Sequence, residues 1–183
     1  FIGRLVDLKG VDVLLRAVAR APDTRLEVIG DGPLRDPLTL LSKQLGISSR
    51  VEWQGQMPPA EIAPRLAKAD LLVLPSRKDG WGAVVNEALM LGTPVISSSA
   101  CGASDLIRHD WLGSVVPAND VDALARAIND WAALGRRTTK DRNRVREWSR
   151  CISGEAIAGY LEAILGYVYE DTVRPIAPWR TMP

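Results

Sequence analysis

The chain has 183 residues and a formal net charge of +1, from 23 lysines and arginines against 22 aspartates and glutamates. Such a balance provides no overall field to attract nucleic acid or anionic lipid, so we expect no nucleic-acid partner. Hydrophobic residues make up 46% and charged residues 25%, which is typical of a folded globular domain and argues against a disordered or fibrous chain.

The first part of the sequence alternates helical patterns with short apolar runs. Apolar residues recur at helical spacing after Gly10, and a β-rich run then ends at Gly30. The run 71–74 is apolar on both faces, which is typical of a strand inside a covered parallel sheet. The expected elements, in order, are helix 11–19, strand 25–29, helix 34–45, strand 51–53 with a turn at Gly55, helix 58–69 and strand 71–74.

The same alternation continues to residue 116, and only helical patterns follow. The expected elements here are helix 83–91, strand 94–97, a short helix at 102–107, a short strand at 112–116, and helices with apolar stripes at 121–128 and 157–168. This order predicts an α/β fold, a doubly wound Rossmann-like parallel sheet with helices on both faces and a helical C-terminal end.

The boundaries of this domain follow from the same patterns. We expect one domain over residues 1–169 and a C-terminal tail over 170–183, with an extended arm from Asp171. The opening Phe1-Ile2-Gly3 resembles the end of a strand without its beginning, so we expect the chain to be a fragment that lacks an N-terminal portion.

Few residues outside the loops suggest chemistry. Cys101 and Cys151 lack metal-binding spacing and fit reduced thiols in a cytoplasmic protein. His109, the only histidine, is expected to be a turn residue. No signal peptide is visible, and no apolar run approaches the ~20 residues of a membrane span.

Two of the expected strand-to-helix loops have compositions suited to an anionic ligand. Ligands of such sheets bind beyond the carboxyl ends of the strands. The loop from Gly3 to Gly10 holds Arg4, a planar fork for phosphate oxygens, and Lys9, a compact charge. The loop Gly30-Asp31-Gly32-Pro33 lets a ligand approach the backbone closely. Taken alone, the first is equally consistent with a solvated loop, and the second is more typical of a turn.

A third loop, residues 75–82, leads into the helix that carries Glu87. The free N–H groups of a helix N-terminus favour phosphate, and Glu87 should reach back toward that end. Its carboxylate, placed among Val84, Val85 and Ala88, would be costly to bury without donors such as ligand hydroxyls. Asp79 lies on the other side of two glycines. A ligand with phosphates in the middle and hydroxyl groups at both ends would contact all of these groups, and a nucleotide sugar has that order of parts. A salt bridge for Glu87 and a turn role for Asp79 remain alternatives.

Taken together, these loops resemble a known family. The matching segments are GRLVDLKGVDVLL, LEVIGDGPLR, ADLLVLPSRKDGWGAVVNEALMLGTPVISS and GSVVPANDVDALARAI. Over residues 1–135 the sequence resembles the C-terminal, nucleotide-sugar-binding domain of family 4 (group 1) retaining glycosyltransferases of the GT-B fold. As a set the segments are specific, although each loop alone is weak.

The resemblance implies roles for individual residues. Arg4 and Lys9 would hold the diphosphate, Asp79 would contact the transferred sugar, and Glu87 would bind the ribose hydroxyls. Asp79 stands where the family usually has Glu, so its side chain is one methylene shorter. The residues implied in donor binding are Gly3, Arg4, Lys9, Gly32, Gly82, Ala83, Val84 and Glu87, and those implied in catalysis are Arg4, Lys9 and Asp79.

The implied activity is transfer of a sugar from a UDP- or GDP-linked donor to an acceptor hydroxyl, with retention and without a metal. The acceptor-binding domain, which comes first in such enzymes, would be absent, so this chain alone is expected to be inactive. The full enzyme would be cytoplasmic and compatible with peripheral association at the inner face of the membrane. The alternative is a nucleotide-binding module without catalysis. An NAD-dependent dehydrogenase lacks support because no GxGxxG follows a strand.

Overall fold

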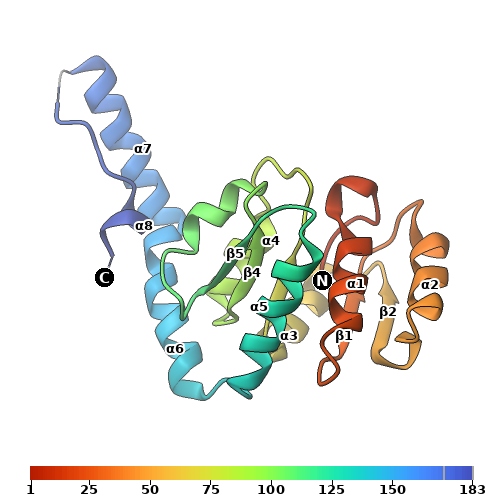
Figure 1. Cartoon of the computed structure of the whole chain (residues 1–183). Coiled ribbons are helices and arrows are strands. Elements are labelled where there is room, and N and C mark those ends of the chain that lie inside the picture. The colour runs from red at the N-terminus through yellow and green to blue at the C-terminus, as the bar shows by residue number, and fades with distance from the viewer. Residues whose placement is uncertain (171, 183) are drawn as a thin grey trace.

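The structure, a computed structural model, describes residues 1–170 and 172–182. Strands and helices alternate through the first two thirds of the chain, and helices alone follow (Figure 1). The strands are β1 Leu26–Ile29, β2 Val51–Gly55, β3 Leu72–Leu74, β4 Val95–Ser98 and β5 Gly113–Val116. The helices are α1 Val11–Ala19, α2 Arg35–Gln44, α3 Pro59–Lys68, α4 Ala83–Met90, α5 Val121–Ala133, α6 Thr139–Trp148, α7 Gly154–Tyr169 and α8 Pro178–Thr181. Short 3-10 turns lie at Asp7–Lys9, Ser48–Arg50, Gly102–Leu106 and Ser149–Ile152.

All strand pairs in the described residues are parallel. β1 pairs with β2, and β3, β4 and β5 form a second group with β4 in the middle. Residues 1–3 run beside β1, since the Ile29 N–H donates to the Phe1 carbonyl and the Gly3 N–H donates to the Ile29 carbonyl. The expected α/β class, with parallel strands and helices on both faces, is therefore confirmed, although the strands form two hydrogen-bonded groups rather than one ladder.

The core lies between the strands and the helices that cover them. β3 and β4 are buried along their whole lengths, and for β3 the uninterrupted apolar run 71–74 predicts this burial. α1 packs against α5 on one face, and Figure 1 shows α3 behind the strands. This packing fixes the strand ends, and with them the loops that follow β3 and β4.

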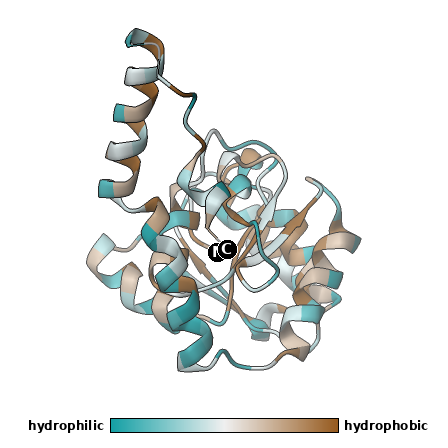
Figure 2. Cartoon of the chain, turned by 90° about the vertical axis from the view of Figure 1, so that its left-hand side faces the viewer, coloured by the Kyte–Doolittle hydropathy of each residue, from teal (hydrophilic) through white to brown (hydrophobic). Residues whose placement is uncertain are grey.

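The helical C-terminal end contains one helix that the sequence patterns did not predict. α6 buries only Val145 and Trp148, so its charged sequence shows no apolar stripe. α7 buries none of its residues and stands away from the body, with apolar stretches along it (Figure 2). On this helix the side chains of Leu161, Leu165 and Val168 are exposed.

The extended arm expected after residue 170 is wrong for its last part, while its first residue, Asp171, lies outside the described residues. Residues 178–181 form α8, and Trp179 packs on this same chain. Its indole Nε1 donates to Asp105 at 2.9 Å, and its ring meets Tyr160 edge to face. Trp179 is therefore partly buried against this same chain.

Length and composition alone single out one helical run among the described residues, Thr139–Tyr169, as able to cross a membrane. This is weak evidence, because a 3-10 turn at Ser149–Ile152 interrupts the run and α6 is strongly charged. α7 by itself has 16 residues, short of the ~20 that a span needs.

Candidate functional site

The basic loop (residues 3–10) and the α4 loop (residues 75–82) lie side by side. The Arg77 N–H donates to the Leu8 carbonyl at 2.8 Å. The Arg77 guanidinium donates to both carboxylate oxygens of Asp12, at 2.8 and 2.7 Å, and to the Asp7 carbonyl at 2.7 Å. Gly10 has φ 63°, and a Cβ there would collide with the Pro75 carbonyl. The two loops are therefore locked together through backbone contacts and one bidentate ion pair.

The ion pair with Arg77 lowers the pKa of Asp12. Partial burial would raise the pKa of Asp12, but the hydrogen bonds and charge of Arg77 outweigh it and hold that pKa below its ordinary value. Asp12 is consequently ionised at neutral pH, and the lock between the loops is formed.

This lock brings together two residues that the sequence analysis had placed on separate loops. Lys9 Nζ lies 2.5 Å from Asp79 Oδ2, and the two side chains are 26% and 12% exposed. The presumed phosphate cation and the presumed sugar carboxylate therefore form a direct, half-buried ion pair. The sequence indicated that both belong to one site, but not that they pair.

The N-terminus of α4 is open toward this ion pair. Gly82 is its N-cap with φ 86°, no side chain caps the helix, and its first turn contains no acid. A Cβ at Gly82 would collide with Cys101 Sγ and Leu74 Cδ2, and its third contact is Asp79 Oδ2 at 3.7 Å. The amides of Ala83 and Val84, which begin the helix, are thus not engaged by a side-chain cap.

Residues 97–102 lie against the α4 loop on its other side from the basic loop. The Asp79 N–H donates to the Ala100 carbonyl at 3.0 Å, and Cys101 Sγ donates to the Trp81 carbonyl at 2.9 Å. Both cysteines are free and buried, and Cys101 supports the α4 loop from behind.

Glu87 lies one turn into α4, but its surroundings differ from the expectation. Glu87 is exposed while Val85 and Ala88 are buried, so the cost of burying its carboxylate among apolar neighbours does not arise. Within residues 1–170 and 172–182 its carboxylate has no hydrogen bond or ion pair, so the salt-bridge alternative also finds no partner. Trp81, 43% exposed, donates its indole N–H to Asn86 at 2.8 Å.

A cavity of about 740 Å³ lies at the carboxyl ends of β1 and β2. It is lined by Ile2, Gly3, Arg4, Ile29, Gly30, Asp31, Gly32, Gln56, Met57 and Ile62. Gly3, Arg4 and Gly32 were expected at the site, and the exposed Arg4 adds a charge. The sequence analysis missed Gln56 and Met57, since the only signal at these residues is their place directly after a strand.

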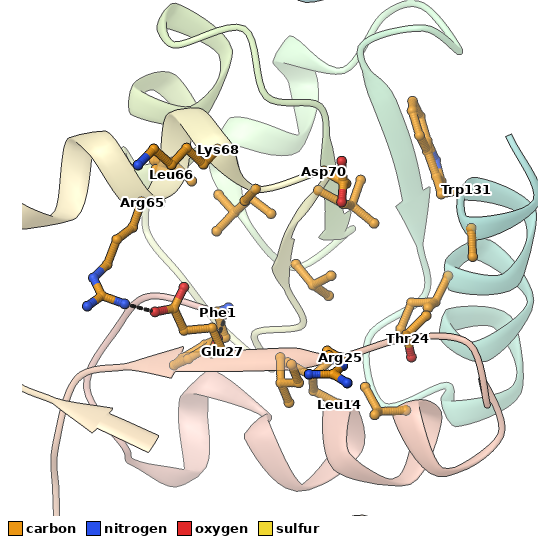
Figure 3. A pocket seen from close by; sticks show the side chains of 18 of the residues that line it. Phe1, Leu14, Thr24, Arg25, Glu27, Arg65, Leu66, Lys68, Asp70 and Trp131 are labelled. Carbon is orange, nitrogen blue, oxygen red and sulfur yellow. Dashed lines mark hydrogen bonds and ion pairs between the residues drawn. The ribbon is translucent and has the colours of Figure 1, made fainter. Parts of the chain in front are cut away.

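The larger cavity, about 1010 Å³, lies between β1 and β3 at their amino ends (Figure 3). Its rim carries the Arg65–Glu27 ion pair, and Trp131 and Asp70 lie on its far side (Figure 3). None of the expected site residues lines it. It is a separate feature on the opposite edge of the strands from the candidate site.

Histidine and metal-ligand clusters contribute nothing to this site in the described part of the chain. The described residues contain no group of three or more His, Cys, Asp or Glu residues that could hold a metal ion. His109 stacks on Trp111 with ring centroids 5.1 Å apart.

Comparison with known proteins places this geometry in context. Residues 1–150 match the family described as Glycosyl transferases group 1. The chain is 33% identical over 159 residues to the GDP-mannose-dependent alpha-(1-6)-phosphatidylinositol monomannoside mannosyltransferase of Mycolicibacterium smegmatis. That alignment covers 81% of this chain and 42% of the relative.

Two solved structures show the same fold. HepE of Anabaena, in complex with UDP, aligns at 25% identity with a TM-score of 0.72, covering 88% of this chain and 48% of that one. The sucrose-phosphate synthase of Thermosynechococcus elongatus aligns at 29% identity with a TM-score of 0.75, covering 93% and 45%. The chain therefore spans less than half the length of each of these proteins.

Proposed function

Because this chain belongs to the group 1 glycosyltransferases, we propose that it is the donor-binding domain, residues 1–169 with a tail at 170–183, of a longer retaining glycosyltransferase. The enzyme would transfer a sugar from a nucleoside diphosphate to an acceptor hydroxyl. One observation carries this proposal: Lys9 and Asp79 meet next to the uncapped N-terminus of α4. A cation, a carboxylate and free amides at one point suit a diphosphate that carries a sugar.

Different residues would bind different parts of the donor. The diphosphate would lie between Lys9 and the amides of Ala83 and Val84, where Gly82 permits close approach. Arg4 would reach the same phosphates from the edge of the 740 Å³ cavity. That cavity, with Gly3 and Gly32 in its wall, would take the nucleoside, and the exposed Glu87 would accept hydrogen bonds from the ribose hydroxyls.

These groups also account for the chemistry. When the bond from the sugar to the diphosphate breaks, negative charge develops on the leaving phosphate. Arg4, Lys9 and the amides of α4 would stabilise that charge, which is electrostatic catalysis by preorganised donors. The charge stabilisation that this step needs is thus supplied by the chain itself, without a metal ion.

The nature of the donor is suggested by relatives. HepE is described in complex with UDP, and the mycobacterial relative is described as GDP-mannose-dependent. We infer a UDP- or GDP-linked donor. We further propose that a separate acceptor-binding domain of the same protein completes the site, that this chain alone does not transfer sugar, and that the full enzyme is cytoplasmic and associates peripherally with the inner face of the membrane.

A second candidate, a nucleotide-binding module without catalysis, draws support from the Asp79 side chain. Asp79 is one methylene shorter than Glu and is already engaged by Lys9. Transfer by a longer form of the protein, with transfer lost in Asp79→Ala, would separate the enzyme from the module.

Titration calorimetry on this chain tests donor binding. UDP or GDP should bind, and at a hundred times the dissociation constant should stabilise the fold by about 2.7 kcal/mol. Glu87→Ala should weaken binding of nucleosides and nucleoside diphosphates alike, by about 1.5–3 kcal/mol. Arg4→Ala should weaken diphosphates far more than nucleosides. Glu147→Ala, an exposed acid on α6, is the matched control.

Two results would overturn the proposal. The first is a folded chain that binds neither UDP nor GDP. The second is equal loss of nucleoside and diphosphate affinity in Arg4→Ala, which would show that Arg4 does not contact the phosphates.

A further inference from the structure

The ion pair between Lys9 and Asp79 suggests a role for Asp79 beyond contact with the sugar. Resting on the function proposed above, we propose that Asp79 is a counter-ion that weakens binding of the free nucleoside diphosphate product relative to the intact donor. Product release would then be favoured by a fixed negative charge beside the phosphate-binding cation. The ion pair at 2.5 Å, 12% exposed on the Asp79 side, is the observation that leads to this.

The carboxylate is held in place by its backbone. The Asp79 N–H donates to the Ala100 carbonyl at 3.0 Å, and the Asp79 carbonyl accepts from the Gly102 N–H at 3.2 Å. The backbone next to Lys9 is held from the other side, because Gly10 packs directly on Pro75. A diphosphate that binds Lys9 must therefore do so with the Asp79 carboxylate still close by.

The neighbouring charges do not neutralise Asp79. Arg77, on the same loop, is engaged by Asp12 and Asp7. Lys78 is exposed, and Cys101, which packs behind the loop, donates to the Trp81 carbonyl. Within the described residues, Lys9 is the only cation paired with Asp79. A ligand that binds Lys9 therefore leaves the Asp79 carboxylate without a cation as partner.

Donor and product differ in the charge that Asp79 would face. In a nucleotide sugar both phosphates are esterified, so the diphosphate carries about two negative charges. After transfer the terminal phosphate is a monoester-like group with a second pKa of about 6, so the product carries about one charge more at pH 7.5. That extra charge sits on the phosphate that held the sugar, which is the one nearest Asp79.

The same carboxylate therefore acts oppositely on the two ligands. Toward the donor, it accepts hydrogen bonds from sugar hydroxyls, which offset the loss of its Lys9 partner. Toward the product it offers no hydrogen bond and repels the added charge. Asp79 would thus favour exchange of product for donor without any movement of the loops.

Calorimetric titrations with UDP, UDP-glucose, GDP and GDP-mannose test this on the isolated chain. In Asp79→Asn, which keeps the size of the side chain, we expect the dissociation constant of the nucleoside diphosphate to fall about fivefold. The affinity for the nucleotide sugar should not rise. Asp7→Asn removes an exposed charge from the basic loop without touching Lys9, and should leave the ratio of the two affinities unchanged.

Three further measurements separate this role from a merely structural one. The gain in Asp79→Asn should shrink at pH 5.5, where the terminal phosphate of the product takes up a proton. It should shrink at high salt, because screening weakens the repulsion. The gain in affinity should also be smaller in a Lys9→Gln background, because Asp79→Asn then frees no lysine for the phosphates. A double-mutant cycle would measure this difference.

The outcomes distinguish this inference from the proposed function. If the wild-type chain binds no nucleoside diphosphate, both fail. If it binds UDP or GDP but Asp79→Asn does not tighten that binding, or tightens donor and product equally, only the counter-ion role is overturned. Thermal unfolding of each variant confirms that it is folded.

Discussion

The α4 loop and helix α7 use their side chains in opposite ways. The α4 loop is polar and glycine-rich in sequence, yet its Asp79 and Arg77 are largely covered and each is paired with an opposite charge. α7 is the more apolar segment, yet it buries no residue and exposes Leu161 and Leu165 (Figure 2). In these two segments, polarity along the sequence does not decide burial.

The contrast shows what each region depends on. The α4 loop is held by backbone hydrogen bonds to the basic loop and to residues 97–102, so its side chains stay in place without a ligand. α7 is held mainly at its first turn, next to the 3-10 turn at Ser149–Ile152, and by contacts with α8. A preorganised candidate site and a largely exposed helix therefore lie within one small domain.

The largest expected effect is at the lock between the two loops. Gly10→Ala should lower the free energy of unfolding by about 3 kcal/mol or more, because φ is 63° and the new Cβ would strike the Pro75 carbonyl. Gly46→Ala is the control, since φ is 69° but no atom lies within 4 Å. It should cost only about 1–2 kcal/mol. Equal losses in urea unfolding would mean that the loops are not packed together.

A smaller effect is expected for the ion pair on the same lock. Asp12→Asn should destabilise the chain by about 1 kcal/mol at pH 7, because the pair is bidentate but partly exposed. Since the pKa of Asp12 is lowered in the folded state, this contribution is present above its ordinary pKa and is lost as the pH falls through the folded value. The stability difference between wild type and Asp12→Asn should therefore be constant at neutral pH and shrink as the pH falls below the ordinary pKa of an aspartate.

The smallest effect is expected on α7. Leu165→Ala should change the stability by no more than about 0.5 kcal/mol, because the side chain is 54% exposed and Ala is an equally good helix former. Leu14→Ala on α1, which is fully buried, should cost about 2–5 kcal/mol in the same assay. A core-like loss for Leu165→Ala would show that α7 is covered in solution, and the contrast would fail.

The sequence predicted the order of elements well wherever apolar periodicity and burial coincide. The strand at β3 and the helix at α4 were found within a residue or two, because an uninterrupted apolar run and a closing glycine mark them. α6 was missed since only two of its residues are buried. The tail was described as extended because nothing local to Trp179 shows that Asp105 and Tyr160 lie within its reach.

For the candidate site, the sequence by itself determined which residue types stand at the carboxyl ends of the strands: Arg4 and Lys9 after one, Asp79 and the glycines after another. Chain order and parallel topology bring such loops to one edge of the sheet. Only the tertiary structure decided that Lys9 and Asp79 pair, that Arg77 is engaged by Asp12, and that Glu87 is exposed. Partners 70 and 65 residues apart are chosen by how the loops pack, and no local pattern encodes that distance.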